Sequence, residues 1–270
     1  MTDPSTNPPL ARTALAAPGQ GTFRPRPGRA PLFRMLAAQA GMEMRLTLRR
    51  GESLLLTLVI PVLLLVGVSQ TTVVRLPSSD RVGFLAPGVL ALAVMSTAFT
   101  GQAISTGFER SYGVLKRLGA SALSRRELLV AKTLAVLAVI VLQVAVIVGV
   151  ALALDWRPAP SGIPAAVGLV MLGTAAFSGL GLLLAGTLRA EATLAAANLV
   201  YLLMLAAGGV MFALPSSAAP LLELLPITAL VDGLRDVLSH GGAGPLRVWV
   251  VLAVWAVGSI AAAGRWFRWE

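Results

Sequence analysis

The sequence predicts an all-α integral membrane protein with six transmembrane helices. Of its 270 residues, 56% are hydrophobic and 13% are charged, and its mean hydropathy is +0.81. Soluble domains carry about 25% charged residues, so this composition excludes an ordinary soluble domain. Apolar runs of about 20 residues, the length of a membrane-spanning helix, recur along the chain. The net charge of +10 lies mostly beside these runs, which favours a role in membrane topology over nucleic-acid binding.

Residues 1–30 are predicted to form a disordered cytoplasmic tail, and residues 31–270 the transmembrane domain. The tail is rich in Pro, Gly, Ala, Ser and Thr and has no apolar h-region, so we do not interpret it as a cleaved signal peptide. In Pro31–Arg50, apolar and charged side chains recur at near-helical spacing. We expect an amphipathic helix in the headgroup plane; the alternative is a plain cytoplasmic extension of the first span.

Six apolar segments follow, and each is long enough to cross a bilayer. They are Ser53–Val74, Val82–Thr106, Glu127–Leu154, Ala165–Leu188, Ala192–Leu214 and Leu246–Gly264. In the fourth segment, small residues lie four apart in the pairs Ala175/Gly179 and Gly181/Ala185. This spacing predicts a tight contact with another helix.

Leu214–Pro245, between the fifth and sixth spans, is the longest predicted loop and is broken by prolines. Within it, Leu221–Leu225 is too short to span but apolar enough to form a re-entrant segment in the outer leaflet. Ile227–Ser239 has the pattern of a short amphipathic helix.

The distribution of basic residues predicts that both termini are cytoplasmic. With that orientation about seventeen Lys and Arg residues face the cytoplasm and about five face outward. The outward five are Arg75, Arg81, Arg157, Arg235 and Arg247.

Gly107–Arg126 is a short basic, amphipathic segment between two long apolar spans. A charged helix fixed between two spans is well placed to receive force from a soluble partner. The alternative is that its charges are ordinary cytoplasmic loop charges.

Several kinds of chemistry are missing from the sequence. No predicted span centre carries an ionisable residue, which disfavours a self-powered secondary carrier. We predict no metal site and no catalytic residue, because the chain has no cysteine and a lone His240 in an outer loop. Neither lysine, Lys116 nor Lys132, follows a glycine as a P-loop requires. Energy for active transport must therefore come from another polypeptide.

Two motifs at matching places among the six spans resemble the permease subunit of bacterial type-2 ABC exporters of the daunorubicin-resistance-like kind. One runs from Phe108 to Leu118 and continues in Ser124–Leu128; the other is Leu225–Arg235. The resemblance covers Arg34–Arg268. One departure is Leu225, where the family often has Asn before Pro.

The resemblance implies a coupling helix at Glu109–Gly119, a second contact at Arg189–Glu191, and a connecting helix at Pro31–Arg50. The coupling residues it implies are Glu109, Arg110, Lys116, Arg117, Arg125, Arg126 and Arg189. They would contact two copies of a separate P-loop ATPase, which binds ATP and Mg. The permease would pair with itself or with a second permease. The translocation path it implies includes Thr97, Thr100, Asn198, Tyr201, Met204 and Met211.

The implied function is a non-catalytic permease in the bacterial inner (plasma) membrane that exports a lipophilic or amphipathic compound, such as a drug or lipid. Two alternatives stay open. One is an exporter of a lipid-linked glycan, with the same fold and the same kind of ATPase. The other is a structural or regulatory membrane subunit without a transport path. An intramembrane enzyme is disfavoured, because acid and base groups are missing from the spans.

Overall fold

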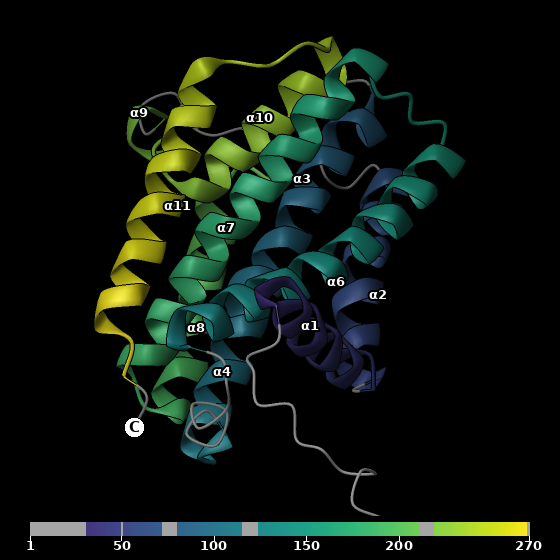
Figure 1. Cartoon of the computed structure of the whole chain (residues 1–270). Helices are drawn as coiled ribbons and strands as arrows, with labels where there is room; N and C mark the ends of the chain where they lie inside the picture. The colour runs from purple at the N-terminus through teal and green to yellow at the C-terminus, as the bar shows by residue number, and fades with distance from the viewer. Residues whose placement is uncertain (1–30, 50, 72–79, 115–123, 211–218, 269–270) are drawn as a thin grey trace, which may run out of the picture.

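The computed structural model describes residues 31–49, 51–71, 80–114, 124–210 and 219–268, and in these ranges the regular structure is helical throughout (Figure 1). The α-helices are α1 (Leu32–Arg49), α2 (Gly51–Gln70), α3 (Arg81–Met95), α4 (Gln102–Ser111), α6 (Arg125–Ala153), α7 (Ile163–Thr187), α8 (Ala190–Ala207), α9 (Ala219–Leu222), α10 (Pro226–His240) and α11 (Leu246–Trp266). A π-helical segment, η1 (Ser96–Gly101), joins α3 to α4, and a 3-10 turn, η2 (Pro160–Gly162), precedes α7. The predicted tail lies outside the described residues.

Five helical segments within the described residues are long and apolar enough to cross a membrane. They are Arg81–Ser111, Glu127–Ala153, Pro160–Thr187, Ala190–Ala207 and Leu246–Trp266. These are the second to sixth predicted spans, so the class of helical membrane protein is confirmed. The first predicted span corresponds to α2, whose described apolar part, Thr57–Gln70, is shorter. A sixth crossing therefore stays a prediction.

The fifth span ends earlier than the sequence predicts. We expected it to reach Leu214, whereas α8 ends at Ala207. The next residue, Gly208, lies so close to Ile227 that a Cβ at that position would be 2.8 Å from the isoleucine side chain. Gly209 then adopts φ of 61°, a conformation that commonly terminates helices. Tertiary contact and glycine geometry thus end the helix inside an apolar run.

The centre of the bundle is one continuous helical segment formed by α3, η1 and α4 (Figure 1). Most of its apolar side chains are buried by the surrounding helices, and some, such as Leu85 and Met95, are fully buried. Helix α7 packs against it at Gly181, where a Cβ would lie 2.8 Å from the Phe99 carbonyl oxygen. On another face α7 meets α11 at Gly179, where a Cβ would lie 2.2 Å from the Ser259 hydroxyl. These contacts confirm the predicted close helix packing.

The predicted amphipathic helix after the fifth span is also confirmed, as α10. Its apolar side, including Ile227, Leu230 and Leu234, is fully buried in the main core. The preceding α9 is a single turn, and whether the predicted Leu221–Leu225 segment re-enters the membrane stays a prediction. Helix α10 contacts the start of α3 and the middle of the bundle. We call the region formed by α10, the start of α3 and the end of α8 the α10 end.

The opposite end contains the C-terminus of α4, the N-terminal part of α6, the α7–α8 turn and α1; we call it the α4 end (Figure 1). Helix α1 packs along α6 there. Phe33 and Met42 of α1 remain exposed, whereas Glu43 is partly buried. The predicted amphipathic character is therefore present, although its position relative to lipid stays a prediction.

Candidate functional site

Three of the predicted coupling residues gather at the α4 end. Glu109 and Arg110 lie in the last turn of α4, and Arg189 is the N-cap of α8. Arg125 and Arg126 begin α6 at the same end, and the structure does not describe their side chains. Lys116 and Arg117 lie outside the described residues. The predicted coupling residues that the structure describes therefore lie at one end of the bundle.

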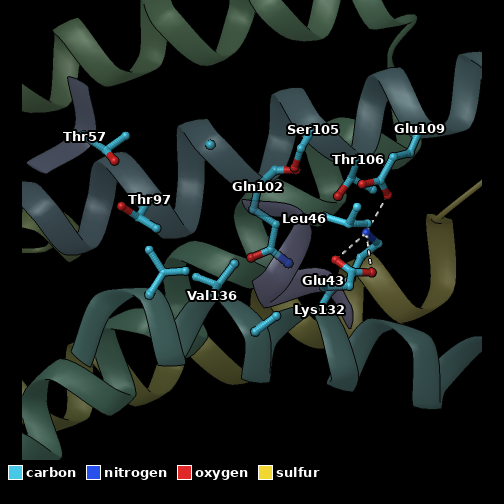
Figure 2. Close-up of a pocket in the computed structure, with 13 residues that line it drawn as sticks. Glu43, Leu46, Thr57, Thr97, Gln102, Ser105, Thr106, Glu109, Lys132 and Val136 are labelled. Carbon is cyan, nitrogen blue, oxygen red and sulfur yellow. Dashed lines mark hydrogen bonds and ion pairs between the residues drawn. The ribbon is translucent and has the colours of Figure 1, made fainter. Parts of the chain in front are cut away.

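The side chain of Glu109 does not point freely into solvent. Its carboxylate lies 2.5 Å from the ammonium of Lys132, which also contacts a carboxylate oxygen of Glu43 at 2.9 Å (Figure 2). The Lys132 side chain is only 4% exposed. Burying an unpaired charge costs free energy, and the two carboxylates offset this cost for the Lys132 ammonium inside the bundle. One ammonium therefore ties α1, α4 and α6 together, and we call these three residues the ionic triad.

Local sequence signals position Lys132. A capping box starts α6: Ser124 accepts a hydrogen bond from the Glu127 backbone N–H, and the Glu127 carboxylate accepts from the Ser124 N–H. This reciprocal pair satisfies two N–H groups that would otherwise lack partners at the helix start. With the start defined, Lys132 falls two turns into α6, on the side that faces α1 and α4.

A second connection joins α4 to the α7–α8 turn. The Arg110 guanidinium donates to the Leu188 carbonyl oxygen, just after the last turn of α7. A positive charge is favourable there because the C-terminal end of a helix is partially negative. Nearby, Gly107 packs on Thr193 of α8, and a Cβ at Gly107 would lie 3.3 Å from the threonine methyl. The two predicted contact elements are therefore joined directly.

A cavity of about 130 Å³ lies next to the ionic triad, between α1, α2, the central helix and α6 (Figure 2). From the central helix it is lined by Thr97, Gly101, Gln102, Ser105, Thr106 and Glu109, and from α6 by Lys132, Ala135, Val136 and Val139. Both sets recur every three or four residues, so each forms one face of a helix. The π-helical turn η1 borders the cavity, and such turns often accompany functional sites.

Two side chains in the cavity wall are buried without hydrogen-bond partners among the described residues. They are Gln102, with neither amide nitrogen nor oxygen paired, and Thr106, with an unpaired hydroxyl. Gln102 is 3% exposed and Thr106 is fully buried. Deeper in the bundle the polar groups are paired: Thr97 donates to Gln143 at 2.9 Å, and the Gln143 amide nitrogen donates to the Thr57 carbonyl at 3.1 Å. The cavity therefore holds three of the buried polar atoms that lack a partner among the described residues; the hydroxyls of Thr100 and Ser178 lie outside its lining.

The predicted path residues occupy different environments. Thr97 and Thr100 lie in η1, and Thr97 faces α6 rather than α8. Asn198 is exposed on α8, where its amide donates to the Leu194 carbonyl of its own helix. Tyr201 and Met204 of α8 are partly buried against the main core. Met211 lies outside the described residues. The structure does not assemble this set into one lining, and its role stays a prediction.

Sequence reasoning missed the cavity and two members of the triad. The pattern of Pro31–Arg50 places Glu43 on the polar face of a helix without indicating its partner, and the residues before Lys132 indicate only that it is not a P-loop lysine. A signal was present: Gln102, Thr106 and Glu109 recur at helical spacing on a segment that is otherwise apolar. A polar stripe of that kind indicates a polar surface within a bundle.

Comparison with known proteins identifies the family. The model of the "ABC-2 family transporter protein" family matches residues 68–265, most of the chain. A search of curated proteins finds no match. Members of this family are membrane components of ABC transporters, which associate with an ABC ATPase. With this match and its apolar helices, the chain belongs to the ABC-2 family of membrane permeases.

Proposed function

We propose that this protein is the permease subunit of an ATP-driven exporter. It moves a lipophilic or amphipathic compound out of the cytoplasm or the inner leaflet of a bacterial inner membrane. Two copies of a separate ATPase bind ATP and Mg and supply the energy. Two permease chains, identical or different, form the membrane part. Both termini and the α4 end face the cytoplasm, which agrees with the excess of Lys and Arg on that side.

The observation that carries this proposal is the mechanical connection at the α4 end. Arg110 joins α4 to the end of α7, and Lys132 joins α4 to α6 and α1. A displacement of the α4 end by an ATPase would therefore move four helices together. Because α4 continues through η1 into α3, the same displacement extends along the centre of the bundle.

The contact surface itself is proposed to begin after Glu109 and Arg110. Both side chains are engaged within the chain, so they position the coupling helix and transmit force. Lys116 and Arg117, in the following basic segment, are proposed to contact the ATPase. Arg189, exposed at the α7–α8 turn, provides the second contact.

The test is purification of the tagged protein from its native membranes in mild detergent, with identification of co-purifying chains by mass spectrometry. We expect a stoichiometric P-loop ATPase. Its reproducible absence from intact, folded protein would contradict the proposal and favour a subunit without transport function.

A second test separates coupling from folding. Lys116→Glu/Arg117→Glu is expected to abolish transport-linked ATP hydrolysis while the protein inserts normally. Arg247→Glu, at the other end of the bundle, serves as the matched charge-reversal control. Normal coupling in the double variant would exclude this segment as the contact. Reversing Glu109 is a poorer test, because it would also break the ionic triad.

A further inference from the structure

Two side chains on one face of α4 present polar atoms to the cavity beside the ionic triad, and these atoms have no partner among the described residues. They are the nitrogen and oxygen of the Gln102 carboxamide and the hydroxyl of Thr106. Gln102 is 3% exposed and Thr106 is fully buried. The Gln102 amide reaches from α4 toward α6 (Figure 2). Because native structures pair buried polar groups with protein, water or ligand, these atoms indicate a partner inside the cavity.

The charged side chains of the cavity wall are already engaged with one another. Carboxylate oxygens of Glu43 and Glu109 contact the Lys132 ammonium, and Glu43 also accepts a hydrogen bond from the Gln39 amide at 3.2 Å. An added anion would be repelled by the two carboxylates, and an added cation by the ammonium. The unpaired amide and hydroxyl are neutral groups, so the partner that complements them is neutral.

The wall across the cavity from the Gln102 amide is apolar. Ala135, Val136 and Val139 of α6 line it, and Leu46 of α1 adds to it (Figure 2). These side chains neither donate nor accept hydrogen bonds, so water placed against them has few polar partners. Room for one water needs only ~10–15 Å³, and the cavity of about 130 Å³ is several times larger. It therefore suits a molecule of a few non-hydrogen atoms with one polar and one aliphatic end.

A primary carboxamide is the group that complements the Gln102 side chain on both of its atoms. Gln102 presents an N–H donor and a carbonyl acceptor side by side. A second primary carboxamide presents the same two groups in reverse order, so two parallel hydrogen bonds form. The secondary amides of peptides and lipids hold N–H and C=O on opposite sides, because the trans form is strongly preferred. A single hydroxyl donates and accepts through one atom and cannot face both groups squarely.

We propose that this cavity is a binding site for a small neutral molecule that carries a primary carboxamide and a short aliphatic group. The ligand oxygen accepts from the Gln102 amide nitrogen, and the ligand N–H donates to the Gln102 oxygen. Thr106 lies one turn further along the same face of α4, and its hydroxyl donates to the second lone pair of the ligand oxygen. The aliphatic group packs against Val136 and Val139.

The site lies within a single chain and uses neither a second permease nor an ATPase. It therefore stands independently of the proposed export function. Among the described residues of the predicted path, Thr97 lines the cavity. Asn198, Tyr201 and Met204 lie on α8, which contributes no described lining residue.

The test measures binding of three probes of one shape to the purified full chain by ligand-observed NMR, with protein-free micelles as the reference. Isobutyramide carries the carboxamide, methyl isopropyl ketone lacks its N–H donors, and isobutyrate replaces it with a charge. We expect saturable binding of isobutyramide alone, in the millimolar range typical of so small a ligand. Equal binding of the ketone would show an apolar void, and equal binding of isobutyrate an anion site. No saturable binding of isobutyramide would show a hydrated cavity, and each of these three results overturns the proposal.

A fourth probe tests the paired geometry and separates a primary carboxamide from the amides of peptides and lipids. N-methylisobutyramide keeps the carbonyl and one N–H but holds them on opposite sides. It is expected to bind at least about tenfold more weakly than isobutyramide, because it cannot form both hydrogen bonds with Gln102. Equal binding of the two amides would overturn the paired geometry.

Two variants locate the site. Gln102→Leu is expected to weaken isobutyramide binding by at least about tenfold and Thr106→Val by about threefold, since they remove two hydrogen bonds and one. Each keeps a similar side-chain volume and removes polar atoms without partners among the described residues, so both should fold. Gln70→Leu, at the exposed end of α2, is the matched control and should bind normally. Undiminished binding in either cavity variant would place the probe elsewhere and overturn the assignment.

Discussion

Two cations within the bundle, the buried Lys132 at the α4 end and the partly buried Arg235 at the α10 end, are held in different ways. The Arg235 guanidinium donates to the backbone carbonyls of Phe84, Gly209 and Val210 at 2.9–3.2 Å. It also lies 3.8 Å above the centre of the Phe84 ring. Lys132 is held instead by two carboxylates and borders a cavity with unpaired polar groups.

The chemical nature of the groups around each cation explains why Arg235 and Lys132 are held differently. Carbonyls near the C-terminal end of α8 are partially negative and stabilise Arg235. A carboxylate oxygen of Asp232 lies 4.0 Å from the Arg235 guanidinium, and Arg235 connects α8, α10 and α3. Burial lowers the pKa of Arg235 to about 10, and Asp232 partly opposes this effect. Arg235 thus forms a structural junction with backbone carbonyls, and it also lines a cavity with Asp80, Asp232 and Asp236. The α4 end differs because Gln102 and Thr106 lack hydrogen-bond partners among the described residues. Two cations within one bundle are thus stabilised by different partners, carboxylates for Lys132 and mainly backbone carbonyls for Arg235.

The largest expected effect is at the α4 end. Lys132→Met leaves two facing carboxylates without their cation and should destabilise the protein by about 3–5 kcal/mol. Thermal unfolding in detergent, followed by circular dichroism, measures this loss. The triple variant Lys132→Met/Glu43→Gln/Glu109→Gln removes the charges together and should recover most of the stability. If the single and triple variants were equally unstable, the ionic triad would not be the cause.

The next effect is at the α10 end. Arg235→Met leaves three partly buried carbonyls without this donor, and we expect a loss of about 2–4 kcal/mol in the same assay. Arg247→Met is the matched control, because Arg247 forms a more exposed ion pair with Glu223 and should contribute less than about 1 kcal/mol. Equal effects of the two variants would contradict the junction role of Arg235.

A smaller effect of opposite sign is expected at the cavity. Gln102→Leu removes an amide that lacks partners and should raise the free energy of unfolding by about 1–3 kcal/mol in ligand-free protein. The same assay measures this gain. A loss of stability would show that the Gln102 amide already has hydrogen-bond partners in the ligand-free protein. The α4 end would then not differ from the α10 end in this respect.

The smallest effect concerns pH. Burial raises the pKa of Asp232 above its ordinary value, and the Arg235 charge only partly offsets this. Because the folded-state pKa is raised, the associated stability is fully present below the ordinary carboxyl pKa and is lost as pH rises through the raised value. Relative to Asp232→Asn, the wild type should therefore gain stability between pH 7 and pH ~4. Parallel melting curves that do not diverge with pH would contradict this.

Much of the fold was predictable because apolar length and helical periodicity are local properties. The second to sixth spans, the α10 helix and the close contacts of α7 follow from the composition of their own segments. The end of α8 was not predictable in this way, because the apolar run continues and the termination depends on Gly208 meeting Ile227, which lies in a different helix.

The candidate site likewise combines features that one segment specifies with features that depend on contacts between helices. The sequence determined by itself that the chain is a helical membrane protein with a basic segment after the second span, since hydropathy and charge need no partner to be recognised. Only the tertiary structure decided that Glu109 faces inward. Its partners Lys132 and Glu43 lie 23 and 66 residues away in the sequence, and Gln102 shares their cavity only because α1 and α6 pack beside α4. Ion pairs and cavities are properties of side chains from several helices, so no single segment carries the information that specifies them.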